Sequence, residues 1–287
     1  MRGFGHWTLG INAMSIEHTE GIVLKTYDYS DTSKIAVVFT KRFGKVKVIA
    51  KGARNQRSKM SAIVEPGSLV KMVFYMKPER ELFQLSEAGL LDQFTAVRSD
   101  IEKFAYYMYI LELVDSLFEH EEGDGCFFES LVSLIRAFSV SADAEMCVRA
   151  VEVAVLHALG HMLELTKCVE CGREIPSALL TGAAYHAGGR VRFHENRKVF
   201  NYSFGHGGIL CRSCAPAERN RAHCSHACAA AMAALLGADP GAVAALDPSF
   251  RQRAELKNIL RKTLDFHLGK ALKSLSFLDQ VLVGRKP

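Results

Sequence analysis

The stretch that decides the fold of the N-terminal part is Lys34-Ile-Ala-Val-Val-Phe-Thr40, a turn at Arg42-Phe-Gly44, and Lys45-Val-Lys-Val-Ile-Ala50. The first segment is rich in apolar and β-branched residues. The second alternates lysine with valine, as a strand with one face toward the core and one toward solvent does. The pattern therefore predicts two β-strands separated by a turn.

Three further segments around this stretch have the same strand character: Gly21–Tyr27, Leu69–Tyr75 and Leu82–Ser86. Five short strands with glycine-containing turns, within about seventy residues, fit a small closed barrel. We therefore predict an OB-fold over residues 19–92, preceded by a disordered extension over residues 1–18.

Beyond Asp92 the apolar residues follow the spacing of helices. The predicted helices are Ile101–Phe118, Phe127–Phe138, Ala144–Leu165, Ser225–Leu236, Phe250–Leu268 and Leu272–Leu282. The predicted class is therefore α+β, with an N-terminal OB-fold barrel, a helical domain over residues 93–165 and 218–287, and an inserted four-cysteine zinc module over residues 166–217.

Two cysteine pairs, Cys168-Val-Glu-Cys171 and Cys211-Arg-Ser-Cys214, define that module. Each pair can present two thiolates from one tight turn, and together they complete the tetrahedral sulfur site that suits Zn²⁺. Eight cysteines without a secretion signal favour a reducing compartment, where paired thiolates bind metal rather than oxidise. Four cysteines also fill the coordination shell, so we expect structural rather than catalytic zinc.

Other histidines and cysteines leave alternatives open. A histidine can replace one cysteine ligand, and the candidates are His186, His194 and His206. A second metal site is conceivable at His223, Cys224 and Cys228. A third candidate combines His157, His161 and Glu164, which would share one face of the predicted helix. Exposed histidines and an ordinary polar patch are the simpler interpretations.

Charge is distributed unevenly, although the net charge is only +5. The segment from Glu112 to Glu129 is rich in acidic residues, whereas residues 41–59 contain eight basic residues and no acidic one. Long cationic side chains on a strand and a flexible loop can follow a phosphate backbone. The predicted nucleic-acid contacts are Lys41, Arg42, Lys45, Lys47, Lys51, Arg54, Arg57 and Lys59.

Aromatic residues near the basic segment offer stacking surfaces for unpaired bases. The candidates are Tyr27, Tyr29, Phe39, Phe43 and Tyr75, some of which must instead fill the barrel core. The same composition fits an RNA-binding adaptor, because a basic OB-fold can hold either nucleic acid. A zinc-dependent hydrolase is the enzymatic alternative, but the chain has no Walker loop, His-Glu-x-x-His or Gly-x-Ser-x-Gly motif. No apolar run approaches the length of a membrane span.

Several motifs, taken in order along the chain, resemble the bacterial RecO family. They are Glu20-Gly-Ile-Val-Leu24, Ser30-Asp-Thr-Ser33, Phe43-Gly-Lys45, Ala50-Lys-Gly-Ala-Arg54, Glu65-Pro-Gly67, the segment from Leu82 to Ala88, the two cysteine pairs with Gly207-Gly208 ahead of Cys211, Leu264-Asp-Phe-His-Leu268 and Lys273-Ser-Leu-Ser-Phe-Leu278. The resemblance spans nearly the whole chain.

This resemblance implies an OB-fold, a helical domain and a structural zinc site. It also implies a non-enzymatic recombination mediator of the RecF-type repair pathway, cytoplasmic and nucleoid-associated. Such a protein binds single- and double-stranded DNA, anneals complementary strands, and helps to load RecA onto DNA coated with single-stranded-DNA-binding protein (SSB). The expected partners are RecR and the acidic, Phe-terminated tail of SSB. Arg136 and Arg149, on predicted helices, are candidate contacts for that tail.

Overall fold

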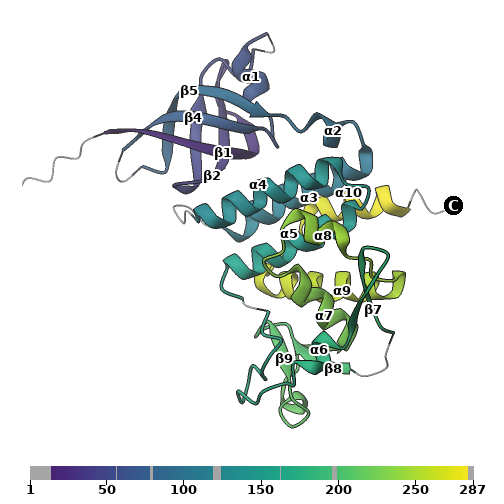
Figure 1. Ribbon diagram of the computed structural model, residues 1–287. Coiled ribbons are helices and arrows are strands. Elements are labelled where there is room, and N and C mark those ends of the chain that lie inside the picture. Colours follow the sequence, from purple (N-terminus) through teal and green to yellow (C-terminus); the bar gives the residue numbers. More distant parts are fainter. Residues whose placement is uncertain are drawn as a thin grey trace, which may run out of the picture. The chain divides into compact units, whose positions relative to one another are not determined.

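The computed structural model describes residues 14–55, 57–77, 80–118, 124–161, 163–195 and 199–283 (Figure 1). These residues form two compact units, one reaching Gln93 and the other beginning at Phe94. Most of the predicted N-terminal extension, residues 1–13, lies outside the described residues. Within them, no helix combines the length and the apolar character that crossing a membrane requires.

The first unit is a closed five-stranded barrel in the order β1–β2–β3–β5–β4. β3 and β5 pair in parallel, and the other neighbours pair antiparallel. This arrangement confirms the predicted N-terminal barrel. The strands are β1 (Ser15–Asp28), β2 (Lys34–Thr40), β3 (Gly44–Ala50), β4 (Leu69–Met76) and β5 (Leu82–Asp92).

β1 closes the barrel because it pairs on both sides. Its first half pairs with β4, from Ser15 to Ile22, and its second half pairs with β2, from Gly21 to Asp28. A shift of register after Val23 lets one strand serve both neighbours. β1 therefore begins before residue 19, the predicted boundary of the barrel. Its first residues are polar, and only the partner strand β4 reveals that they are paired.

The barrel core contains the inward side chains of alternating strand residues, such as Val46 and Val48 of β3. A short helix, α1 (Lys59–Ile63), follows β3 and packs Met60 and Ile63 against that core. Ser58 caps the helix by accepting a hydrogen bond from the Met60 N–H. The sequence analysis placed Lys59 in a loop, since a helix of one turn has no detectable periodicity.

The second unit is mainly helical. Most of its helices begin at an aspartate or serine whose side chain accepts a backbone N–H, which satisfies donors that the first turn leaves unpaired. α4 packs on α5, and α10 packs on α3. The helices are α2 (Thr95–Arg98), α3 (Ile101–Leu117), α4 (Gly125–Val140), α5 (Ala144–Ala158), α6 (Ala178–Thr181), α7 (His226–Leu235), α8 (Pro240–Ala245), α9 (Phe250–Leu268) and α10 (Lys273–Val283).

α5 ends earlier than predicted. The sequence analysis extended it to Leu165, but Gly160 adopts a left-handed conformation (φ +76°) just after the last turn and ends the helix. His157, His161 and Glu164 therefore do not share a helix face, and this proposed metal trio is wrong. His161 instead stacks on His267, with ring centroids 3.5 Å apart.

Two small sheets interrupt the helices. One is the antiparallel hairpin of β6 (Ala184–Ala187) and β7 (Arg190–Phe193). The other has the order β10–β8–β9, and a short 3₁₀ turn, Ala215–Ala217, follows β9. Its strands are β8 (Val199–Ser203), β9 (Gly208–Leu210) and β10 (Arg221–Ser225). β10 lies beyond residue 217, the predicted end of the module; the five-part division of the chain remains a prediction.

A buried ion pair lies inside the helical unit. Arg149 and Glu152 are 1% and 0% exposed, and their charged atoms approach to 2.8 Å. The Tyr109 hydroxyl donates a hydrogen bond of 2.7 Å to Glu152. The Arg149 Nε and Nη2 atoms have no hydrogen-bond partner among the described residues. Arg149 therefore depends on Glu152 for the compensation of its charge.

Removing Glu152 is expected to destabilise this unit strongly. Glu152→Ala leaves a buried guanidinium without its counter-charge, which costs about 3–5 kcal/mol. Urea denaturation should show a lower midpoint for the helical unit than in the unchanged protein.

Two control variants test whether the effect comes from the buried, unpaired charge of Arg149 or from the loss of any carboxylate. Glu129→Ala, at an exposed position of α4, should leave the midpoint unchanged. Arg149→Met combined with Glu152→Leu should recover most of the lost stability, because no charge is then left buried. Equal midpoints for Glu152→Ala and the unchanged protein would contradict the role of the pair.

Candidate nucleic-acid interface and metal centre

The eight predicted cations lie at three places on the barrel. Residues 51–59 follow the end of β3 that pairs Ala50 with Lys34, whereas Lys41 and Arg42 lie in the turn at the other end of the same strand pair. Seven residues of extended chain separate these ends by about 20 Å. The structure therefore does not bring all eight cations into one patch.

In the loop after β3, the described residues 51–55 and 57–59 make specific contacts. Gly52 has a left-handed conformation (φ +73°), and Ala53 is buried in the barrel core. Asn55 accepts a hydrogen bond from the Arg57 N–H at 3.0 Å. The loop thus presents its exposed cations from a defined backbone. These cations are Lys51, Arg54, Arg57 and Lys59.

Two lysines of β3 lie between the two ends. Lys45 and Lys47 are partly exposed on the outward side of the strand, because Val46 and Val48 point into the core. The Lys47 ammonium lies 3.6 Å from the exposed carboxylate of Glu81. An ion pair this exposed is weak, so it leaves Lys47 able to exchange its partner for a phosphate.

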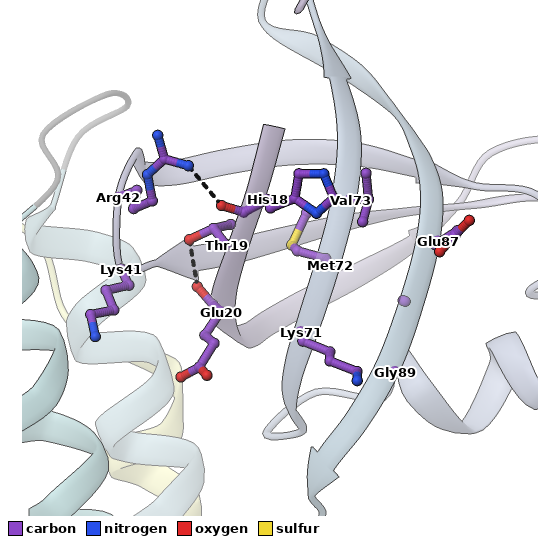
Figure 2. A pocket seen from close by; sticks show the side chains of 11 residues that line it. His18, Thr19, Glu20, Lys41, Arg42, Lys71, Met72, Val73, Glu87 and Gly89 are labelled. Atoms are coloured by element: carbon purple, nitrogen blue, oxygen red, sulfur yellow. Dashed lines mark hydrogen bonds between the residues drawn. The ribbon is translucent and has the colours of Figure 1, made fainter. Parts of the chain in front are cut away.

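Lys41 and Arg42 line a groove of about 680 Å³ over β1, β4 and β5 (Figure 2). Arg42 donates a hydrogen bond of 2.9 Å to the His18 carbonyl and lies 3.6 Å from Glu17. Lys71 of β4 also lines the groove, and Figure 2 shows Glu20 between Lys41 and Lys71. The groove therefore mixes cations with carboxylates, unlike the loop after β3.

Lys71 is a cation that the sequence analysis missed. It stands alone between apolar residues, so no local cluster of charge marks it. The strand register places it opposite Glu20 on one side and Gly89 on the other. The Lys71 side chain lies over Gly89, since a Cβ at that position would lie 2.8 Å from the Lys71 Cε and the lysine would have to shift. Only the pairing of β4 with its neighbours reveals this position.

The two arginines predicted to meet an acidic tail have different surroundings. Arg136 is exposed on α4. Arg149 is buried and paired with Glu152, so the expectation that it lies on an exposed helix surface is wrong. The sequence did not predict this burial, because an arginine is usually exposed to solvent.

The four cysteines of the second unit converge. The sulfur atoms of Cys168, Cys171, Cys211 and Cys214 all lie within 4.8 Å of one another, and those of Cys171 and Cys211 are 3.8 Å apart. A tetrahedral metal with sulfur ligands at about 2.3 Å has ligand–ligand edges of about 3.8 Å. The geometry therefore fits a single four-coordinate metal ion with no open position.

Two turns hold these sulfurs in place. In the first, the Gly172 N–H donates to the Cys168 carbonyl at 2.9 Å, and Gly172 is left-handed (φ +70°). Gly208, before the second pair, packs tightly, since a Cβ there would lie 2.4 Å from Val169 Cγ1. Glycine at these positions is therefore a geometric requirement of the site.

Backbone donors favour the thiolate form of two cysteines. The Cys211 N–H donates to the Cys168 sulfur at 3.3 Å. A hydrogen bond from the Cys214 backbone lowers the pKa of Cys211 to about 6. A hydrogen bond with the Cys211 side chain raises the pKa of Cys214, to about 12. Thiolates are the form that binds metal, so a metal ion would displace the proton of Cys214.

The histidines considered as alternative ligands have other contacts. His194 stacks on Tyr185, and His206 lies 3.3 Å from the carboxylate of Glu218. Cys224 and Cys228 are buried, whereas His223 is exposed. Among the described residues, only the four-cysteine cluster brings three or more such groups within reach of one ion.

Comparisons with known proteins cover both units. The family described as Recombination protein O N terminal matches residues 14–94, and that described as Recombination protein O C terminal matches residues 98–276. The DNA repair protein RecO of Bacillus pumilus (strain SAFR-032) is 27% identical over 263 residues, covering 92% of this chain and 93% of that protein. The DNA repair protein RecO of Anaeromyxobacter sp. (strain Fw109-5) is 30% identical, covering 91% and 94%.

The cysteine geometry predicts one bound metal ion per chain. Cys211→Ser should lose the ion, as measured by elemental analysis, and should lower the melting temperature, because metal binding contributes folding free energy. Cys126→Ser, an exposed cysteine on α4, is the matched control and should keep both. Full metal content in Cys211→Ser would contradict a four-sulfur site.

Proposed function

Because the chain belongs to the RecO family of DNA repair proteins, we propose that it acts as a non-enzymatic recombination mediator. In this role it binds single- and double-stranded DNA, anneals complementary strands, and helps to load RecA onto SSB-coated DNA. The observation that carries the proposal is the barrel with the exposed cations Lys51, Arg54, Arg57 and Lys59 after β3, which match the chemistry of a phosphate backbone.

Annealing requires no bond chemistry. Two strands must come close, their phosphate repulsion must be reduced, and their bases must remain able to pair. The barrel has cations at both ends of the β2–β3 pair, which offers separate places for backbone contact. Each neutralised phosphate releases counterions, so binding should weaken steeply as salt increases.

We further propose that the four-cysteine site holds Zn²⁺ with a structural role. A zinc ion with four sulfur ligands has no position for water, so the site gives no support to a zinc-dependent hydrolase. Its contribution is to stabilise the turns that carry Cys168 and Cys211. RecR and the acidic tail of SSB remain the proposed partners, and Arg136 remains a candidate contact for the tail because it is exposed.

The loop cations are expected to determine affinity. Replacing Lys51, Arg57 and Lys59 by alanine should weaken binding to a single-stranded oligonucleotide and reduce the slope of log K against log salt by about 2, at about 0.7 per lost phosphate contact. Fluorescence anisotropy over a range of salt concentrations measures both quantities. The comparison variant removes Lys41, Arg42 and Lys71, which shows how much of the slope the groove of Figure 2 contributes.

A second experiment tests the mediator role directly. The protein should anneal complementary SSB-coated DNA strands without ATP, and the loop variant should anneal them more slowly. Competition with RNA of the same sequence separates a DNA-binding mediator from an RNA-binding adaptor. Unchanged DNA binding and salt slope in the loop variant would contradict the assignment of these cations.

A further inference from the structure

One partly exposed row of side chains crosses the outer face of the barrel. The strand register pairs Tyr27 of β1 with Ile35 of β2, and Ile35 with Ile49 of β3. Ala36 and Ala50 belong to the barrel core, so the residues before them point outward, since side chains alternate along a strand. The row thus forms an apolar strip ending in an aromatic ring that is 50% exposed.

Tyr29 adds a second aromatic ring beyond the end of β1. It is 51% exposed and, like Tyr27, is not part of the barrel core. The other aromatic residues considered for stacking are less available. Phe39 is fully buried, and Phe43 packs edge-on against Phe74 with centroids 5.6 Å apart.

Two lysines lie beside the apolar row, each two residues along its strand from a member of the row. Lys25 pairs with Val37, and Val37 pairs with Lys47, so the two partly exposed lysines stand on either side of β2. Val37 itself is buried, so the open part of this face is the end that carries Tyr27 and Ile35. The Lys25 ammonium lies 5.7 Å from the centroid of the Tyr27 ring. Exposed rings beside cations are what a single strand of nucleic acid needs, because its bases stack while its phosphates require positive charge.

Arg54 fastens the loop that carries Tyr29. Its Nη1 donates a hydrogen bond of 2.6 Å to the Ser30 carbonyl, and its Nε lies 3.5 Å from the Asp28 carboxylate. Its backbone N–H donates to the Thr32 carbonyl at 3.1 Å. The Asp28 pair is exposed and therefore weak, so the short hydrogen bond to the Ser30 carbonyl is the contact by which the guanidinium positions the turn that carries Tyr29.

We propose that this face gives the DNA interface its preference for single strands. Unpaired bases stack on Tyr27 and Tyr29, Lys25 and Lys47 contact phosphates, and Arg54 is a positioning residue instead of a phosphate contact. The inference rests on the proposed DNA binding and deepens it. A duplex cannot use these rings, because its bases are already stacked on one another.

The test compares three ligands with the full-length protein. These are a labelled single-stranded oligonucleotide, the same strand with a run of abasic sites, and a duplex. Tyr27→Leu and Tyr29→Leu should each weaken binding to the first about tenfold, with the salt slope unchanged. Neither change should affect binding to the abasic run or to the duplex, because neither offers a free base.

Arg54→Lys separates positioning from phosphate contact. Lysine keeps the charge but lacks the fork that bridges Asp28 and Ser30. If Arg54 positions Tyr29, Arg54→Lys should lose single-strand affinity about as much as Tyr29→Leu does, and the two changes together should not add. Affinity retained in Arg54→Lys but lost in Arg54→Ala would overturn the positioning role.

Phe250→Leu is the matched control, since this ring is exposed on α9 in the other unit and should not affect binding. Absence of DNA binding by the unchanged protein would refute the proposed function itself. Normal DNA binding with unaffected Tyr27→Leu and Tyr29→Leu would refute only the stacking face. Equal losses on all three ligands would also refute it, since base stacking cannot weaken binding to a strand without bases.

Discussion

The double pairing of β1 is the constraint on which the barrel and its surface depend. One strand of 14 residues joins β4 on one side and β2 on the other, with a register shift after Val23. In the part of the barrel that the structure describes, this closure gives every strand a neighbour on both sides, and exposed strand edges are sites of aggregation. It also fixes which residues face outward. Lys25 and Tyr27 stand beside Val37 and Ile35 only because the strand resumes pairing in that register.

The four-cysteine module cannot depend on a hydrophobic core for its stability in the way the barrel does. Its own hydrophobic cluster contains three buried residues, Cys168, Leu210 and Ala215, and each of them either supplies a sulfur atom or is next in sequence to a cysteine that does. A core this small provides little burial to offset the entropy of ordering the chain. Four thiolates on one cation, the site proposed here, would link segments some forty residues apart and take the place of that missing core.

The sequence predicted the helices and strands whose own residues show the pattern of that element. It missed those that are recognisable only from the strand or side chain they contact. β2 and α9 have the predicted bounds, since an apolar run and a capping box mark their ends. β10 was missed because its partner β8 is distant in sequence, with β9 and a 3₁₀ turn between the two strands. The cysteine cluster was predicted because each Cys-x-x-Cys pair is a short motif that the sequence shows directly. The burial of Arg149 was not, because the sequence does not show that Glu152 and Tyr109 surround it.

For the charged residues, too, the sequence does not show which groups each side chain contacts. Counting cations along residues 41–59 correctly marks a basic region, but it treats every cation as equivalent. The fold gives them different surroundings: Lys51 and Arg57 are exposed after β3, Arg42 donates to the His18 carbonyl, and Arg54 donates to the Ser30 carbonyl. Phosphate contacts alone provide affinity that any nucleic acid can use and that salt weakens. Discrimination between strands needs groups that respond to bases, and on this barrel the groups proposed for it are the exposed rings of Tyr27 and Tyr29.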